Sequence, residues 1–181
     1  MTPVIAERWT KLKGLHLKSG AHSPDSTFCV MEAVAFVAGE PWSDHPECAC
    51  PVISAFLRSW NDGLPSDAER DRLLKPLIRS LVGTRNKNLE ERRSLMAADW
   101  LVRVYTPAWL RLAGLVSQAE SLESLPEITS MAQAAVGAAA WAAARDAARA
   151  AVGAKLKPTQ NKLQQSALKL VKRMIALKET A

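Results

Sequence analysis

Apolar residues recur along this chain every three or four positions, the spacing that places them on one face of an α-helix. Residues 24–38 are apolar on nearly every side after the first turn, which predicts a central buried helix. The segments 51–60 and 89–115 each carry their large apolar side chains on one stripe, as helices that pack on a core do. We find no segment with the alternating pattern of a strand. The sequence therefore predicts an all-α fold with a helical bundle as its body.

Residues that start and stop helices divide the chain. Ser23 followed by Pro24 predicts the start of the buried helix, and Gly39 predicts its end. Pro76 lies inside another apolar segment and predicts a kink there. The other predicted starts are Pro51, the capping box Ser66 to Glu69, Asn88, Thr106-Pro107, Ser117 and Pro126, and Lys157-Pro158-Thr159 separates the last two helices.

The C-terminal third differs in composition from the rest. Between Ala132 and Ala154, 14 of 23 residues are alanine, which favours helix but buries little area, so we expect close packing on a neighbour. The last helix is amphipathic and can fold back on the Ala-rich helix as a hairpin or pair with a second subunit. Its apolar face holds Leu163, Ala167, Leu170, Val171, Met174 and Leu177, and its basic face holds Lys162, Lys169, Lys172 and Arg173. We expect a helical core domain at 1–125 and C-terminal helices at 126–181, packed on the core or on a partner in a homo-oligomer.

The positive charge is concentrated in this C-terminal part. The chain carries 24 basic and 18 acidic residues, a net +6. Residues 126–181 contain nine basic and three acidic residues and account for the whole surplus, whereas residues 1–125 are balanced. A neutral body with a cationic tail indicates an acidic partner, such as a nucleic acid, a nucleotide or an acidic protein surface. A lysine face that only keeps the protein in solution is the alternative reading.

Cysteine use and hydropathy bear on the compartment. The chain has three cysteines, an odd and small number that favours a reducing environment. We find neither an N-terminal apolar core of signal-peptide length nor a run of about 18 apolar residues that could span a bilayer. These features predict a cytoplasmic protein that does not bind membranes.

Two sulfur-containing candidates for chemistry lie near the buried helix. His45, Cys48 and Cys50 could ligate zinc, but the C-x-C spacing is tighter than structural zinc sites use, and we expect no metal or cofactor. Cys29 could be a nucleophile with His22 or His45 as its base. Its apolar neighbours favour an inert buried thiol instead.

The charged and aromatic candidates point to ligand binding. Glu32 lies in the apolar helix and must be paired or protonated; Arg103, Arg58, His45 or a cationic ligand could supply the partner. A structural ion pair is one reading, and a carboxylate that grips a ligand is the other. Trp100 and Arg103, close to Tyr105 and Trp109, could form a stacking pocket for a nucleobase. The expected ligand-binding residues are therefore Glu32, His45, Trp100, Arg103, Arg145 and Arg149, the last two as phosphate contacts.

Three segments support a resemblance. The segments SPDSTFCVMEAVAFVAGEPWSDHPECACPVI (23–53), PLIRSLVGTR (76–85) and AADWLVRVYTPAWLRLAGL (97–115) resemble an uncharacterised family of small helical proteins from bacteriophage and bacterial genomes. Members of that family often continue into Ala-rich tails. The resemblance implies a helical body and a phage or mobile-element context, and it carries over no catalytic residue or cofactor.

These observations favour recognition over catalysis. The leading hypothesis is a non-enzymatic helical binding protein for an anionic partner: a nucleotide signal, a nucleic acid or a host protein. In the phage context that the resemblance implies, it would be an accessory protein acting against host defence in the host cytoplasm. One alternative is a thiol- or metal-dependent enzyme that uses Cys29, His45 and Glu32. A further alternative is a structural or virion-associated oligomer.

Overall fold

The computed structural model of the chain describes residues 3–20, 22–23, 27–135, 137 and 157–178. Within these ranges the regular secondary structure is helical, and the one β-type contact is an isolated bridge between Leu17 and Phe28, which confirms the all-α prediction. The chain divides into two units, Met1–Glu90 with Ile175–Ala181, and Glu91–Met174. This division differs from the predicted boundary at 125/126. Residues 91–125 are grouped with residues 126–174 in the second unit, where the Ile128 N–H donates to the Asp99 carboxylate at 3.0 Å.

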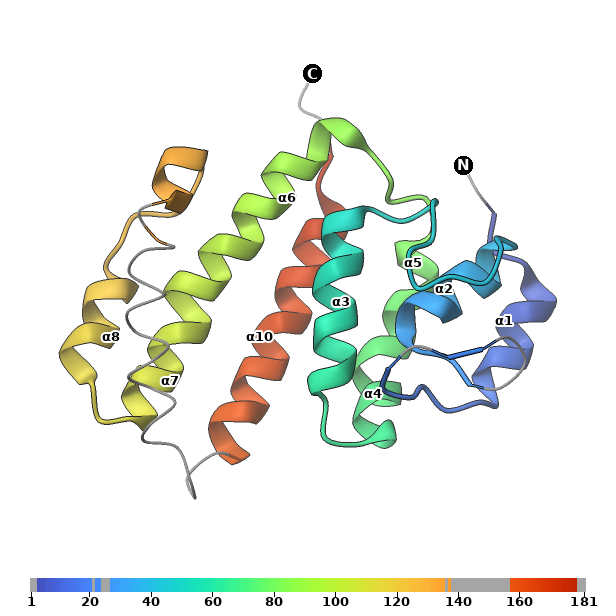
Figure 1. Ribbon diagram of the computed structural model, residues 1–181, viewed down its shortest axis with the longest axis horizontal. Helices are drawn as coiled ribbons and strands as arrows, with labels where there is room; N and C mark the ends of the chain where they lie inside the picture. The colour runs from blue at the N-terminus through green and yellow to red at the C-terminus, as the bar shows by residue number, and fades with distance from the viewer. Residues whose placement is uncertain (1–2, 21, 24–26, 136, 138–156, 179–181) are drawn as a thin grey trace. The chain divides into compact units, whose positions relative to one another are not determined.

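Each unit has its own set of helices (Figure 1). The first unit contains α1 (Ala6–Lys13), α2 (Val30–Ala38), α3 (Pro51–Gly63), α4 (Asp67–Leu74), the 3₁₀ turn η1 (Lys75–Leu77) and α5 (Ile78–Leu81). The second unit contains most of α6 (Lys87–Trp100), the π-helical segment η2 (Leu101–Tyr105), α7 (Thr106–Leu112), α8 (Val116–Glu123), a helical turn at 131–135, and most of α10 (Lys157–Ala176). No helix among the described residues combines the length and the apolar character needed to cross a bilayer.

Helix α2 is the centre of the first unit. All of its residues except Phe36 are buried, and it packs against α1, α3 and α5, which confirms a central buried helix. Gly39 ends it in the left-handed conformation (φ 79°), as predicted. The predicted start at Ser23-Pro24 is wrong, because the helix begins at Val30. Cys29 is its N-cap, and the Cys29 and Glu32 side chains each accept a hydrogen bond from the other residue's backbone N–H in a capping box.

The remaining helices of the first unit largely follow the predicted stops. Helix α3 begins at Pro51 as predicted, and the Ser66 hydroxyl caps α4 by accepting from the Glu69 N–H at 3.3 Å. Pro76 lies in η1 between α4 and α5, which confirms the kink. The sequence did not predict α1. Its N-cap makes no side-chain hydrogen bond, and its start is held instead by the Ile5 N–H, which donates to the Val37 carbonyl at 2.8 Å.

The second unit begins with one continuous helical run through α6, η2 and α7. As predicted, α7 begins at Thr106, with Pro107 in its first turn, although the π-helical turn η2 leads into it without a non-helical residue between them. Helix α8 begins at Val116, one residue before the predicted Ser117. Pro126 does not open a helix: residues 126–129 are non-helical and helix resumes at 131.

An apolar cluster of described residues lies in the second unit. Leu95, Val102, Leu110, Ala119, Leu122 and Ile128 form its buried part. Gly137 lies close against it, since a Cβ there would be 3.1 Å from atoms of both Val102 and Ile128. At this position the Ala-rich segment packs closely on a neighbour, as expected from its composition. Residues 136 and 138–154 of that segment, with Arg145 and Arg149, lie outside the described residues.

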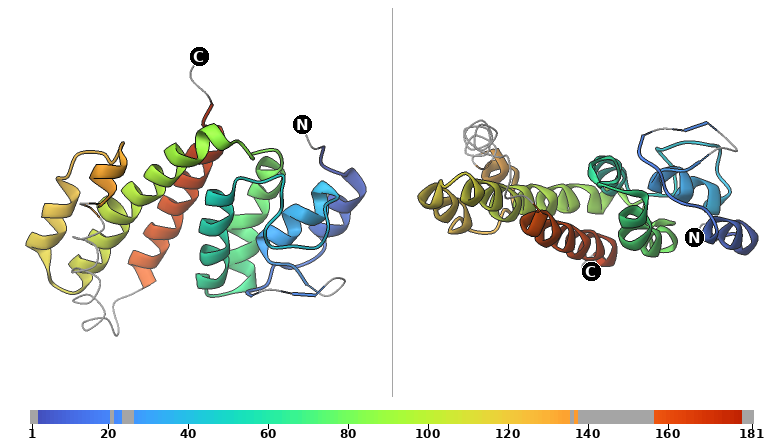
Figure 2. Two further views of the ribbon diagram at one scale, coloured as in Figure 1. Left: turned by 45° about the horizontal axis from the view of Figure 1, so that its top comes forward. Right: turned by 90° about the horizontal axis from the view of Figure 1, so that it is seen from below.

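Helix α10 runs antiparallel to the part of α6 that belongs to the same unit (Figures 1 and 2). The Trp100 Nε1 donates to the Ser166 hydroxyl at 2.7 Å, and the Arg93 Nε donates to the Met174 carbonyl at 3.0 Å. Five of the six predicted apolar-face residues of α10 are buried, and its four basic-face residues are exposed, which confirms the two faces. These described hydrogen bonds join α10 to α6. The predicted hairpin with the Ala-rich helix falls on residues outside the described part of the chain and stays a prediction.

Candidate functional site

Glu32 is fully engaged by its own chain. Its side chain is 2 % exposed, and its oxygens accept hydrogen bonds from the His22 N–H (2.7 Å) and the Cys29 N–H (2.7 Å). The His22 Nδ1 lies 2.9 Å from the Glu32 Oε2. The partner is thus His22, not Arg103, Arg58 or His45 as the sequence suggested. This carboxylate caps α2 and fastens the preceding loop, so it matches the structural reading of the ion pair.

His45 belongs to a separate, exposed group of side chains. Its Nδ1 lies 2.5 Å from a carboxylate oxygen of Asp44. Arg58 donates to the Asp44 carbonyl at 3.0 Å and also approaches the Asp44 carboxylate at 3.7 Å. The structure therefore gives His45 and Glu32 different partners and does not join them in one site.

All three cysteines are buried. Two of them, Cys29 and Cys48, have raised pKa values and are protonated at neutral pH. Burial raises the pKa of Cys29 from 9.0 to about 12. Burial, together with the neighbouring Glu40 carboxylate, raises the pKa of Cys48 to about 12 as well. No group of three or more His, Cys, Asp or Glu side chains in the described part of the chain is placed to hold a metal ion, and that part includes Cys50 and His45. These environments give no support to the thiol- or metal-dependent alternative.

At the predicted stacking pocket, three aromatic rings pack on one another, and Arg103 is bound to groups other than these rings. The Trp100 and Tyr105 rings are 5.3 Å apart, and the Tyr105 and Trp109 rings are 5.9 Å apart. The π-helical turn between them places residues five apart on one face. Arg103 pairs with Asp99 at 2.8 Å and donates to the Leu125 carbonyl at 2.9 Å. Arg103 therefore fastens the segment after α8, and the rings pack on one another.

Helix α10 presents an exposed basic face. Lys162, Lys169, Lys172 and Arg173 are all exposed, and α10 contains no acidic residue. A shallow groove of about 430 Å³ follows this helix and is lined by Asn161, Lys162, Gln165, Ser166 and Lys169. Among the described residues, Glu127 lies 3.9 Å from Arg173, and both side chains of that pair are exposed. This surface can attract an extended anion.

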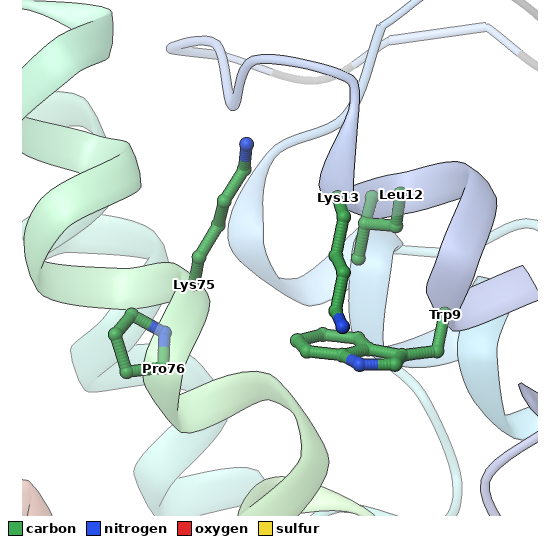
Figure 3. Close-up of a pocket in the computed structure, with 5 residues that line it drawn as sticks. All are labelled: Trp9, Leu12, Lys13, Lys75 and Pro76. Carbon is green, nitrogen blue, oxygen red and sulfur yellow. The ribbon is translucent and has the colours of Figure 1, made fainter.

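A second basic surface was missed by the sequence analysis. Two cations lie near the Trp9 ring, with the Lys13 Nζ and the Arg79 Cζ each 5.7 Å from its centroid. A cavity of about 220 Å³ adjoins the ring and is lined by Trp9, Leu12, Lys13, Lys75 and Pro76 (Figure 3). The spacing of Trp9 and Lys13, four residues apart on one helix, is a signal that the sequence offered. The contribution of Arg79 and Lys75 depends on the fold.

Comparisons of the chain with protein-family models, with curated proteins and with solved structures gave no match. Function is therefore inferred from the chemistry of the chain's own residues, and the resemblance to phage proteins stays a prediction.

Proposed function

We propose that this protein is a non-enzymatic helical binding protein whose partner is a polyanion, with nucleic acid as the first candidate. The observation that carries the proposal is the exposed cationic face of α10. Its four cations lie on one side of a helix whose other side is buried, so the cations are held in a fixed row.

The dimensions of the row suit a phosphate backbone. Lys162 and Arg173 mark its ends, and at about 1.5 Å per helical residue the row is roughly 16 Å long. A duplex presents a phosphate charge about every 1.7 Å along its axis, so several phosphates lie within reach of such a row. The amides of Asn161 and Gln165 in the adjoining groove can donate to phosphate or sugar oxygens.

The non-enzymatic part of the proposal is supported by the state of the side chains that could have served in catalysis. Glu32 caps a helix, and the Cys29 and Cys48 thiols are buried with raised pKa values. A thiol that is protonated at neutral pH is a poor nucleophile. A phage or mobile-element role and a homo-oligomer are further expectations that rest on the resemblance and on the amphipathic pattern.

The test is fluorescence anisotropy of a labelled duplex and a labelled single strand at 50 and 200 mM salt. We expect binding that weakens steeply with salt. In Lys162→Gln with Lys169→Gln, the salt slope should fall by roughly 1.5, since two phosphate contacts are lost. The charge-preserving pair Lys162→Arg with Lys169→Arg should retain the wild-type slope.

A second pair controls for net charge. Lys87→Gln with Arg92→Gln removes two exposed cations of α6 and should leave the slope nearly unchanged. The proposal fails if no polyanion binds at 50 mM salt, or if both Gln pairs weaken binding equally.

A further inference from the structure

The surroundings of Trp9 combine an aromatic face, a cavity and converging cations in the first unit. Lys13 comes from α1, Lys75 from η1 and Arg79 from α5, so three elements bring cations to one place. Figure 3 shows the Lys13 ammonium over the indole and Lys75 across the cavity from it. Such a convergence from separate segments is a product of the fold and not of a local charge run.

The cations around Trp9 are poorly neutralised. No carboxylate among the described residues forms an ion pair with Lys13 or Arg79. Lys75 pairs with Asp71 at 3.2 Å, a carboxylate that His16 also shares. The two cations that face Trp9 are exposed and free to meet an anion from solution.

Two more cations of α1, Arg8 and Lys11, lie against Phe36 and not beside Trp9. The guanidinium of Arg8 lies 5.3 Å from the Phe36 ring centroid, and the Lys11 ammonium lies 5.9 Å from it. The one acidic residue of α1 is Glu7, in its first turn. An approaching anion therefore meets a predominantly cationic helix.

The cavity has one apolar wall and a cationic rim. Trp9, Leu12 and Pro76 form the apolar wall, and Lys13 and Lys75 bring the charge. We propose that this cavity binds one nucleotide unit, with the base against the Trp9 indole and the phosphate held by Lys13, Lys75 and Arg79. Inorganic phosphate would use the cations and leave the apolar wall wet, whereas a nucleotide uses both.

Binding exchanges weak contacts for stronger ones. An exposed cation over an indole gains little, because water screens it, and a stacked nucleobase gains more from the same ring. A phosphate that draws Lys13 and Arg79 off the ring forms charge-assisted hydrogen bonds and opens the indole face for the base. A free mononucleotide and an unpaired nucleotide of a single strand present this same chemistry.

The site is independent of the polyanion surface proposed above, since it lies in the first unit and the basic face of α10 lies in the second. Titration calorimetry at 50 mM salt tests it with three probes: adenosine 5′-monophosphate, a five-nucleotide single strand and inorganic phosphate. The variants are Lys13→Gln with Arg79→Gln, both exposed positions, and Trp9→Leu. The control variant is Lys169→Gln with Lys172→Gln on α10.

We expect the Lys13/Arg79 pair and Trp9→Leu each to weaken nucleotide binding about tenfold or more, and the α10 control to stay within about twofold. Binding of the monophosphate identifies a free nucleotide as the ligand, and binding of the oligonucleotide alone identifies a single strand; either supports the site. Circular dichroism checks the fold, and the Lys13/Arg79 pair decides the matter if Trp9→Leu unfolds. The inference is overturned if neither nucleotide probe binds, if inorganic phosphate binds as tightly as the nucleotide, or if the α10 control weakens binding equally.

Discussion

Each of the two units of this chain is stabilised internally by a different kind of interaction. In the first unit, buried polar side chains tie distant segments to one another. Asn61 is fully buried; its Oδ1 accepts from the Val30 N–H at 3.2 Å, and its Nδ2 donates to the Lys18 carbonyl at 2.8 Å. Arg70, 5 % exposed, donates to the carbonyls of Asn61 and Leu64. In the described part of the second unit, a contiguous apolar cluster packs α6, η2, α7 and α8 together.

The difference follows from the amount of non-helical backbone that each unit contains. Residues 14–20, 22–23, 27–29 and 39–50 of the first unit lie outside helices, and their N–H groups need acceptors. Carboxylates supply them: Asp71 accepts from Leu17, Asp62 from Gly20, and Glu40 from both Glu47 and Cys48. These carboxylates therefore stabilise the loops by accepting hydrogen bonds from their backbone N–H groups. Exposed cations around an open surface are the better guide to a ligand.

Thiol reactivity gives the largest expected contrast between the units. All three cysteines lie in the first unit and are buried. Because burial raises the pKa of Cys29 and of Cys48 from 9.0 to about 12, the thiolate fraction of each at pH 8 falls about a thousandfold. We expect an aromatic disulfide reagent to label them very slowly in the native protein and rapidly in denaturant. The stability that these thiols contribute is complete below pH 9 and is lost as the pH rises toward 12, since the unfolded thiols ionise first.

A cysteine placed in the second unit provides the control for this labelling. Ser124→Cys introduces a thiol at an exposed position and should react at the rate of a free thiol. If Cys29 in the native protein were labelled at that same rate, its burial and its raised pKa would both be contradicted.

Removing the charge of Glu32 should have the largest effect on stability. Glu32→Gln leaves His22 and two backbone N–H groups without a carboxylate, at a cost of about 4 kcal/mol in the free energy of unfolding. Urea denaturation measures the cost, and hydrogen exchange locates it. We expect α2 to lose protection while α7 and α8 keep theirs. Glu47→Gln, at an exposed position, should cost less than about 0.5 kcal/mol; an equal cost for both variants would remove the assigned role of Glu32.

Truncating a side chain of the apolar cluster should destabilise the second unit, as Glu32→Gln should destabilise the first. Leu110 is 0 % exposed, so Leu110→Ala leaves a cavity and should lower the free energy of unfolding by about 3 kcal/mol. Val116→Ala, at a side chain that is 45 % exposed, should cost under about 0.5 kcal/mol. Exchange protection should fall in α7 and α8. Equal loss of protection in α2 would show that the two units unfold together.

The smallest effect concerns Asp71 and its dependence on pH. Burial alone would raise the pKa of this carboxyl, but the bond from the Leu17 N–H, with His16 and Lys75 nearby, outweighs burial and lowers the pKa below 3.8. Its contribution is thus present above pH 4 and is lost as the pH falls through the lowered pKa. Asp71→Asn should cost about 1 kcal/mol at pH 7, and the cost should fall as the pH is lowered below 4, by urea denaturation at each pH. A cost that does not change with pH would argue against the charged pairing.

Some parts of the candidate sites could be predicted from the sequence. Lys162 and Lys169 were placed on an exposed basic face by helical periodicity alone. The partner of Glu32 could not be predicted, because His22 lies outside helix α2, ten residues before Glu32, and no helical spacing relates the two. The cavity beside Trp9 was missed for the same reason, since Arg79 reaches the ring only after α5 packs near α1.

The sequence by itself determined the features whose physics is local. Gly39 ends a helix because glycine adopts positive φ at little cost, and Pro76 interrupts one because it lacks an N–H; both effects act within one helical turn. Tertiary structure decided the features whose partners lie far along the chain. Helix α1 has no capping side chain of its own, and its start depends on the Val37 carbonyl. A hydrogen bond or a cation–π contact between distant residues needs the fold in place first, whereas a cap or a kink needs only its neighbours.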